Sequence, residues 1–246
     1  MARFRALVEY DGAGYFGFQR QRADQPTIQS ELERALSRIV RQPASITGAG
    51  RTDSGVHATG QVISFDSEWN HTTTDLQRAL NANLPADIAI LQVDKADPTF
   101  HPRFDARRRA YEYHIYNAAV RSPLRRQRSW QVAKPLDWER MNQAAACLIG
   151  VHDFATFGQP PQGVVTVREV FTARWERRNE FLVFSIEANA FLYRMVRSIV
   201  GSLEAVGEGR WTVEQFEAAL AARSRSRSGK VAPAQGLTLV SVTYGE

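Results

Sequence analysis

Apolar and polar side chains follow two periodic patterns along the first part of the chain. Where they alternate one by one, the pattern predicts a half-buried strand, and where apolar residues recur every three or four positions, it predicts an amphipathic helix. We expect strands at residues 2–10, 44–47, 60–67 and 87–93, and helices at residues 27–40 and 76–84. Thr27 is the expected N-cap of the first helix, and Pro85 stops the second. This β-α-β-β-α-β order is that of a ferredoxin-like fold.

A similar order recurs in the second part of the chain. We expect strands at residues 108–116, 164–177, 180–190 and 237–244, and helices at residues 136–150 and 190–207 and from residue 212 onward. Asp137 is the expected N-cap of the helix at residues 136–150, and Thr212 with Gln215 is expected to form a capping box at the start of the last helix. A hairpin turn is expected at Arg178 and Asn179. The sequence therefore predicts an α+β protein with two ferredoxin-like domains, residues 1–105 and 106–246, whose mostly antiparallel sheets meet around a central basic cleft. The Arg- and Ser-rich residues 222–230 are expected to form a mobile loop.

The glycine-rich stretch GAGRTDSGVHATGQV, residues 48–62, contains Arg51, Asp53 and His57. In an extended loop, residues i and i+2 project to the same side, so Arg51 and Asp53 can line one wall. A nearby guanidinium favours the ionised form of a carboxylate, which suits Asp53 to act as a nucleophile or to stabilise developing positive charge. An Asx-turn, in which Asp53 bonds to its own backbone, is an equally weighted alternative. His57 is expected to anchor the loop through a hydrogen bond.

Cofactor and metal motifs are not supported by the sequence. Gly12, Gly14 and Gly17 spell G-x-G-x-x-G after a strand, but no helical pattern follows them, as a dinucleotide site would require. The chain has no P-loop, C-x-x-C or H-E-x-x-H motif, and its five histidines are scattered. We therefore expect neither a cofactor nor a metal ion. The only cysteine, Cys147, is expected to be a small buried residue.

The basic residues are almost all arginine. Of the 31 basic residues in this chain of 246, only Lys95, Lys134 and Lys230 are lysines, and the formal net charge is +5. Arginine binds phosphate through two parallel hydrogen bonds and stacks on bases, which favours a nucleic-acid partner, while codon usage in a GC-rich genome is an alternative origin of the bias. The run at residues 121–128 is typical of a loop that follows a phosphate backbone. No apolar run is long enough to span a membrane, and no signal-peptide core precedes Glu9, so a cytoplasmic protein is expected.

Six segments in order together resemble the tRNA pseudouridine synthase A family. They are YDGAGYFGFQRQ (10–21), GRTDSGVHATGQV (50–62), RRAYEYHIYN (108–117), GVHDFATF (150–157), FLYRMVRSIVG (191–201) and APAQGL (232–237). The resemblance covers essentially the whole chain. It implies an isomerase that converts uridine to pseudouridine in the anticodon stem-loop of tRNA, and it implies a homodimer.

The resemblance also implies a role for individual residues. Asp53 matches the essential aspartate of the G-R-T-D motif, and Arg51 matches an arginine implicated in displacing the target base. Tyr111 matches a tyrosine that stacks on the target uracil, although a place in the strand core is also consistent with its pattern. Arg197 matches a basic residue that pairs with the catalytic carboxylate, so the second domain would complete a site begun by the first. The candidate substrate-binding residues are Gln19, His57, Arg121, Arg125 and Arg126.

Two other functional classes are also consistent with the sequence. A non-catalytic RNA-binding protein on the same scaffold is one, although residues 60–67 lack the aromatic pattern of an RNA-recognition strand. A hydrolase that cuts an N-glycosidic bond is the other, and it would release free uracil. The isomerisation itself needs no redox cofactor, because it only exchanges an N1–C1′ bond for a C5–C1′ bond.

Overall fold

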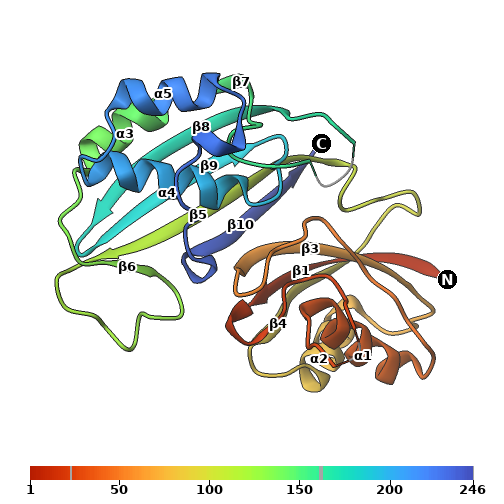
Figure 1. Ribbon diagram of the computed structural model, residues 1–246. Coiled ribbons are helices and arrows are strands. Elements are labelled where there is room, and N and C mark those ends of the chain that lie inside the picture. Colours follow the sequence, from red (N-terminus) through yellow and green to blue (C-terminus); the bar gives the residue numbers. More distant parts are fainter. Residues whose placement is uncertain (23, 161–162, 246) are drawn as a thin grey trace. The chain divides into compact units, whose positions relative to one another are not determined.

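The computed structural model of the chain describes residues 1–22, 24–160 and 163–245 (Figure 1). Contacts within the chain define a first unit, Met1–Arg107 with Leu239–Glu246, and a second unit, Arg108–Thr238. Both units combine helices with strands that pair mainly antiparallel, so the α+β prediction is confirmed. In the part of the chain that the structure describes, no helix is both long and apolar enough to cross a membrane.

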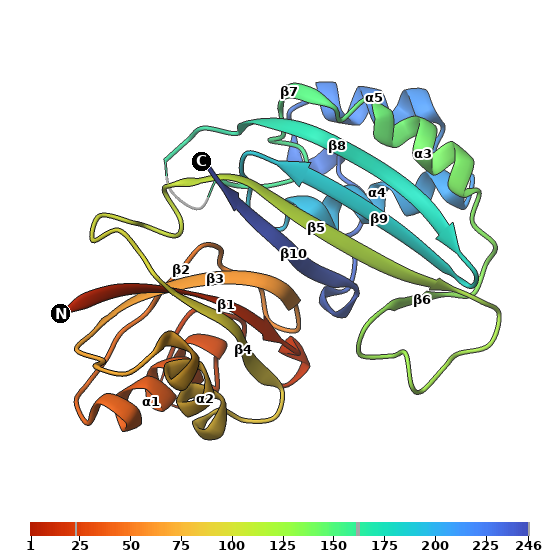
Figure 2. The same ribbon diagram turned by 180° about the vertical axis from the view of Figure 1, so that it is seen from behind.

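The first unit is a small sheet covered by two helices. Strand β1 (Ala2–Tyr10) runs antiparallel to β3 (His57–Ser67) on one side and to β4 (Ile88–Lys95) on the other, and the short β2 (Thr47–Gly48) pairs with β3. Helices α1 (Ile28–Val40) and α2 (Thr73–Asn83) lie side by side on one face of this sheet (Figures 1 and 2). Alternate residues of β1 are buried beneath them, as the period-two pattern predicts.

The local chemistry of the first helix matches its prediction. The strand predicted at residues 44–47 begins only at Thr47, and residues 44–46 are not part of it. The Thr27 hydroxyl accepts from the Ser30 amide, and the Ser30 hydroxyl accepts from the Thr27 amide, which makes a capping box at the start of α1. The amides of Ala44 and Ile46 bond instead to side chains of α1, at Ser37 Oγ and Glu33 Oε1. Only β2 remains as a strand, because these amides are no longer available to a sheet ladder.

The second unit is a larger sheet with three helices on one face. Strand β9 (Phe181–Ala188) lies between β5 (Ala106–Asn117) and β8 (Val167–Arg178), and β7 (Gly150–Asp153) pairs with β8, all antiparallel. The short β6 (Trp130–Val132) runs parallel to β5. Helices α3 (Trp138–Ala146), α4 (Met195–Gly207) and α5 (Val213–Ala221) stand in front of the sheet in Figure 1 and behind it in Figure 2. The last strand, β10 (Leu237–Tyr244), returns the chain to the first unit from residue 239 onward.

Several boundaries in the second unit agree with their predictions. Asp137 caps α3 by accepting from the Arg140 amide, and Thr212 with Gln215 forms the capping box of α5. Asn179 adopts a left-handed conformation in the β8–β9 turn, with a φ of 58°. Helix α3 is shorter than predicted, because the chain turns after Ala146 to enter β7. Neither β6 nor β7 was expected, so the ferredoxin-like order of this unit stays a prediction.

The expectation of a mobile loop at residues 222–230 is wrong. Residues Arg225–Arg227 form a turn of 3-10 helix. The Ser224 amide donates to Thr156 Oγ1 at 3.0 Å, and an Arg225 guanidinium nitrogen donates to the Thr156 carbonyl at 2.9 Å. Burial lowers the pKa of Arg225. The segment is therefore fixed by the fold of the second unit, because its polar groups bond to the buried Thr156.

Candidate functional site

The predicted acid lies in a segment that we call the acid loop, residues 49–56, between β2 and β3. The start of this loop is fixed by a buried side chain of β3. Gln61, which is fully buried, accepts from the Gly50 amide at 3.2 Å and donates to the Gly50 carbonyl at 2.9 Å. The Ala49 amide also donates to the Val62 carbonyl at 2.8 Å. The loop therefore leaves the sheet in a defined direction, because both hydrogen-bonding groups of Gly50 are satisfied.

The far end of the acid loop is a tight turn that begins at Asp53. The Val56 amide donates to the Asp53 carbonyl at 3.1 Å, and Gly55 has a φ of 78°. Glycine adopts this left-handed conformation without steric cost. The turn is closed by the main chain. Asp53 is half-buried and Arg51 is exposed.

Residues 10–18, which begin at the end of β1, hold the acid loop in place through hydrogen bonds. The Phe18 amide donates to the Thr52 carbonyl at 3.0 Å, and the Ser54 hydroxyl donates to the Tyr15 carbonyl at 3.0 Å. The buried hydroxyls of Tyr10 and Thr52 lie 2.8 Å apart. These bonds flank Asp53 on both sides in the sequence, so they limit where its carboxylate can point. Gln19, the next residue along, is exposed.

Two glycines of the G-x-G-x-x-G motif, Gly12 and Gly17, pack against the backbone of the acid loop. A Cβ on Gly12 would lie 2.0 Å from the Val56 carbonyl oxygen, and one on Gly17 would lie 2.8 Å from the Thr52 carbonyl oxygen. Gly17 also has a φ of 92°. The two glycines thus let one loop pack directly on the backbone of the other, which is a use of glycine that needs no cofactor.

His57 anchors the acid loop, as predicted. The ring is 5% exposed, and its Nδ1 lies 3.1 Å from the Gly12 amide and 3.0 Å from Asp11 Oδ1. One nitrogen cannot accept from the amide and donate to the carboxylate in the same tautomer. In either tautomer the ring is tied to the loop at residues 11–12.

Tyr111 lies on β5 of the second unit, opposite Ile186 of β9. Its ring meets that of Phe191 edge to face, with centroids 5.1 Å apart and planes at 88°. Two residues on, Tyr113 is fully buried and donates to the Pro233 carbonyl at 2.7 Å, and burial raises its pKa. Tyr111 is only half-buried. It is therefore positioned by the core packing of the strand without being fully buried.

Arg197 lies in the first turn of α4. The helix begins at Met195 instead of residue 190, because Arg194 adopts a left-handed conformation with a φ of 60°. The Arg197 Nε donates to the Ala232 carbonyl at 2.8 Å, and the Ala232 amide donates to the Arg197 carbonyl at 3.0 Å. The side chain is half-buried. Its direction is thus set by the segment that contains Ala232.

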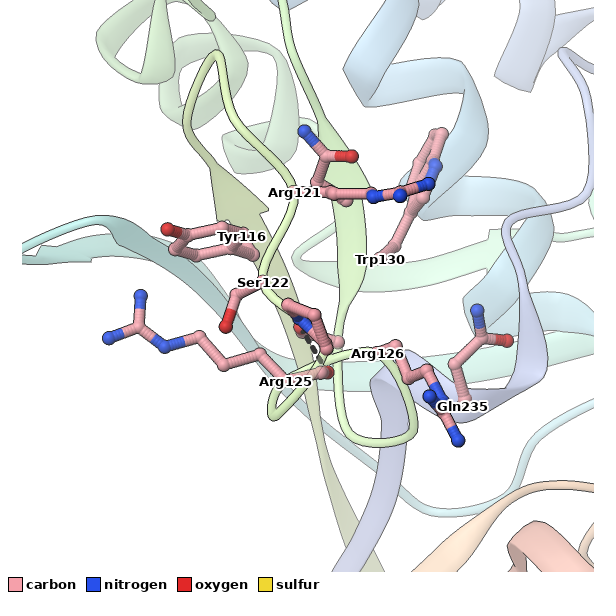
Figure 3. Close-up of a pocket in the computed structure, with 10 residues that line it drawn as sticks. Tyr116, Arg121, Ser122, Arg125, Arg126, Trp130 and Gln235 are labelled. Atoms are coloured by element: carbon pink, nitrogen blue, oxygen red, sulfur yellow. Dashed lines mark hydrogen bonds between the residues drawn. The ribbon is translucent and has the colours of Figure 1, made fainter.

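The three predicted arginines of residues 121–128 come together in one cavity of about 570 Å³, which we call the basic pocket (Figure 3). The lining residues are Tyr116, Arg121, Ser122, Pro123, Arg125, Arg126, Ser129, Trp130, Gln131 and Gln235. The Ser129 hydroxyl donates to the Arg125 carbonyl at 2.8 Å and steadies the loop. The sequence pattern alone does not identify Trp130 or Gln235 as site residues. Gln235 stands in the APAQGL segment, which offered a signal, whereas nothing local to Trp130 distinguished it from a core residue.

The predicted site residues are therefore divided between the units. Asp53, Arg51, Gln19 and His57 belong to the first, and Tyr111, Arg197 and the basic pocket belong to the second. Within the described ranges, no group of three or more His, Cys, Asp and Glu side chains is placed to hold a metal ion.

The similarity between this chain and known proteins extends over its whole length. The family model described as tRNA pseudouridine synthase matches residues 6–105 and 144–245. Three relatives carry the name tRNA pseudouridine synthase A. The one from Caulobacter vibrioides (strain NA1000 / CB15N) is 45% identical over 248 residues, covering 100% of both chains. The one from Aeromonas hydrophila subsp. hydrophila is 46% identical over 96% of this chain and 88% of its own. The one from Bartonella henselae is 44% identical over 99% of this chain and 100% of its own.

Proposed function

This chain belongs to the tRNA pseudouridine synthase family, and we propose that it isomerises uridine to pseudouridine in the anticodon stem-loop of tRNA, with Asp53 as the catalytic carboxylate. The observation that carries the assignment of Asp53 is its place in the acid loop. Asp53 is half-buried, while the residues before and after it are fixed by Tyr10, Phe18 and Tyr15. A group held in this way is pre-organised for reaction with a bound substrate.

The proposed reaction moves one bond and one proton. The N1–C1′ bond of uridine breaks, a C5–C1′ bond forms, the proton leaves C5, and N1 ends with a proton. There is no net oxidation, hydrolysis or group transfer, so the residues of the chain need supply only acid–base and nucleophilic chemistry. Asp53 can begin the reaction by addition to uracil C6, by attack at C1′, or by removing a proton from the sugar.

The other proposed roles follow from the position of each side chain. The ring of Tyr111 packs at nearly a right angle to that of Phe191 and would hold the loosened uracil while it turns. Arg197 would pair with the Asp53 carboxylate, and the exposed Arg51 would enter the stack that the target base leaves. Extracting a base costs a few kcal/mol, about the range that such contacts can offset. His57 is too buried to be a principal substrate contact, so we assign it to positioning the loop.

The proposal extends to the whole protein. Two ferredoxin-like domains, one ending near residue 105 and the other beginning there, would meet around a basic cleft that contains Asp53 and Arg197. Gln19 and the arginines of the basic pocket would contact the RNA. We further propose a homodimer that acts in the cytoplasm. The family match on both sides of residue 107 supports a function that needs both units.

Release of label from a tRNA transcript tests the proposed function. Each uridine carries tritium at C5, and both the label in water and the free uracil are measured after incubation with the protein. We expect release of label without uracil, and no release from a transcript whose anticodon stem-loop uridines are replaced. Free uracil would identify a glycosidic hydrolase, and tight binding without release would identify a binding protein.

A further inference from the structure

We propose that the basic pocket is a second nucleotide subsite, which holds one nucleotide of the RNA strand other than the reacting uridine. Its phosphate would lie against Arg121 and Arg126, and its base against Trp130. This inference rests on the proposed function, because it names an additional part of the same RNA substrate.

The three arginines of the pocket are not equivalent. Arg125 is already engaged: it donates to Glu180 Oε2 at 2.6 Å, and its guanidinium lies 4.6 Å from the centroid of the Tyr116 ring. The hydrogen bond from Arg125 to Glu180 raises the pKa of Arg125. Figure 3 shows its side chain extended on the side of Tyr116, away from Trp130. Arg125 therefore serves as a wall of the pocket.

Arg121 and Arg126 are exposed and make no hydrogen bond or ion pair with any residue that the structure describes. Figure 3 shows Arg121 extended toward Trp130, and Arg126 on the same side of the pocket as Gln235. Among the residues that the structure describes, no acidic side chain lines the cavity. Two unpaired guanidinium groups around one cavity favour an anion, and arginine matches the geometry of a phosphate group with two parallel hydrogen bonds.

Trp130 is held in place by its surroundings in the second unit. Its ring meets Tyr113 edge to face, with centroids 6.3 Å apart, and Lys230 Nζ lies 4.7 Å from its centroid. Lys230 is itself fixed, because it donates at 2.7 Å to Glu204, which is 1% exposed. A ring fixed in this way loses little freedom when a base stacks on it, and stacking of bases on aromatic side chains is sequence-tolerant.

The dimensions and polar groups of the pocket suit a nucleotide. A volume of about 570 Å³ is typical of small-molecule sites, which span roughly 300–1,000 Å³. The Gln235 side chain offers both a donor and an acceptor to a base edge, and the Ser122 hydroxyl can bond to phosphate. A nucleotide fits the pocket better than inorganic phosphate does. Its phosphate would contact the arginines and its base would contact Trp130, whereas inorganic phosphate would make no contact with the Trp130 ring.

The test uses 2-aminopurine riboside 5′-monophosphate, whose fluorescence is quenched when its base stacks. We expect quenching by the full-length protein, weaker binding by about tenfold in Trp130→Leu, and partial recovery in Trp130→Phe. Arg121→Ala and Arg126→Ala should each weaken binding, whereas Arg128→Ala removes one charge from the same loop without touching the pocket lining. Added tRNA should displace the probe and restore its fluorescence.

The variants are then compared in tRNA binding as a function of salt. Arg121→Ala and Arg126→Ala should each reduce the slope of log affinity against log salt by about 0.7, and Arg128→Ala should reduce it less. Equal losses in all three variants would overturn the pocket in favour of a general charged surface. Probe binding that tRNA does not displace would overturn the assignment to RNA. The probe binds without turnover, so a failure of the isomerase assay alone would leave this result intact.

Discussion

At the scale of single residues, the sequence indicates where the loops lie but not which distant backbone segments pack against them. The pattern around Asp53 predicts a loop with an acid and an arginine on it, and the structure places both there. The packing of Gly12 and Gly17 on Val56 and Thr52 could not be predicted. Such a contact depends on which distant backbone comes close, and this information is absent from the local pattern of a G-x-G-x-x-G motif.

Substitution of Gly12 tests the support of the acid loop. In Gly12→Ala, the new Cβ would lie 2.0 Å from the Val56 carbonyl oxygen, so one of the two loops must move. We expect a loss of about 1–3 kcal/mol in the free energy of unfolding, measured by urea denaturation, and reduced isomerisation. Gly14→Ala is the matched control, because nothing lies within 4 Å of its Cβ. Similar losses in both variants would mean that the clash at Val56 does not matter.

At the scale of elements, the periodic pattern predicts helices and strands well where local signals agree. The capped starts of α1, α3 and α5 follow from Thr27, Asp137 and Thr212. The start of α4 is different. Phe191 and Leu192 continue an apolar pattern, but Arg194 takes a left-handed conformation that ends any helix there. The conformation of one residue therefore decides the boundary, and the side-chain pattern does not report it.

The buried carboxylate of α4 gives a prediction at this scale. Glu204 accepts from Lys230 at 2.7 Å and from Arg210 at 2.5 Å, and it is 1% exposed. We expect Glu204→Gln to lower the free energy of unfolding by about 1–3 kcal/mol, because the two cations lose their shared anion but are themselves half-exposed. Glu208→Gln, which removes a less buried carboxylate beside Arg210, should cost below about 1 kcal/mol. A Glu204→Gln protein as stable as the wild type in thermal unfolding would contradict this assignment.

At the scale of the whole molecule, the sequence predicts the α+β class and the separation of the candidate residues into two parts of the chain. The boundary between the units and the return of residues 239–246 to the first unit depend on tertiary contacts. Asp53 lies in the first unit and Arg197 in the second. No local sequence motif therefore contains both residues.

A double-mutant cycle tests whether these two residues act together. Arg197→Met should lower the rate of isomerisation by about a hundredfold or more. In the Asp53→Asn background the same substitution should cost little, because residues that act as a unit are not additive. Arg194→Met, which changes an exposed residue just before α4, is the matched control. Losses that multiply in the double variant would show that Arg197 acts without Asp53.

The most direct test of the central claim is single-turnover release of C5 tritium from tRNA by Asp53→Asn, with tRNA binding measured on the same protein. We predict binding within a few-fold of the wild type, because the substitution keeps the size of the side chain, and a release rate reduced at least about ten-thousandfold. Release at a rate near that of the wild type, with binding intact, would show that another group begins the reaction.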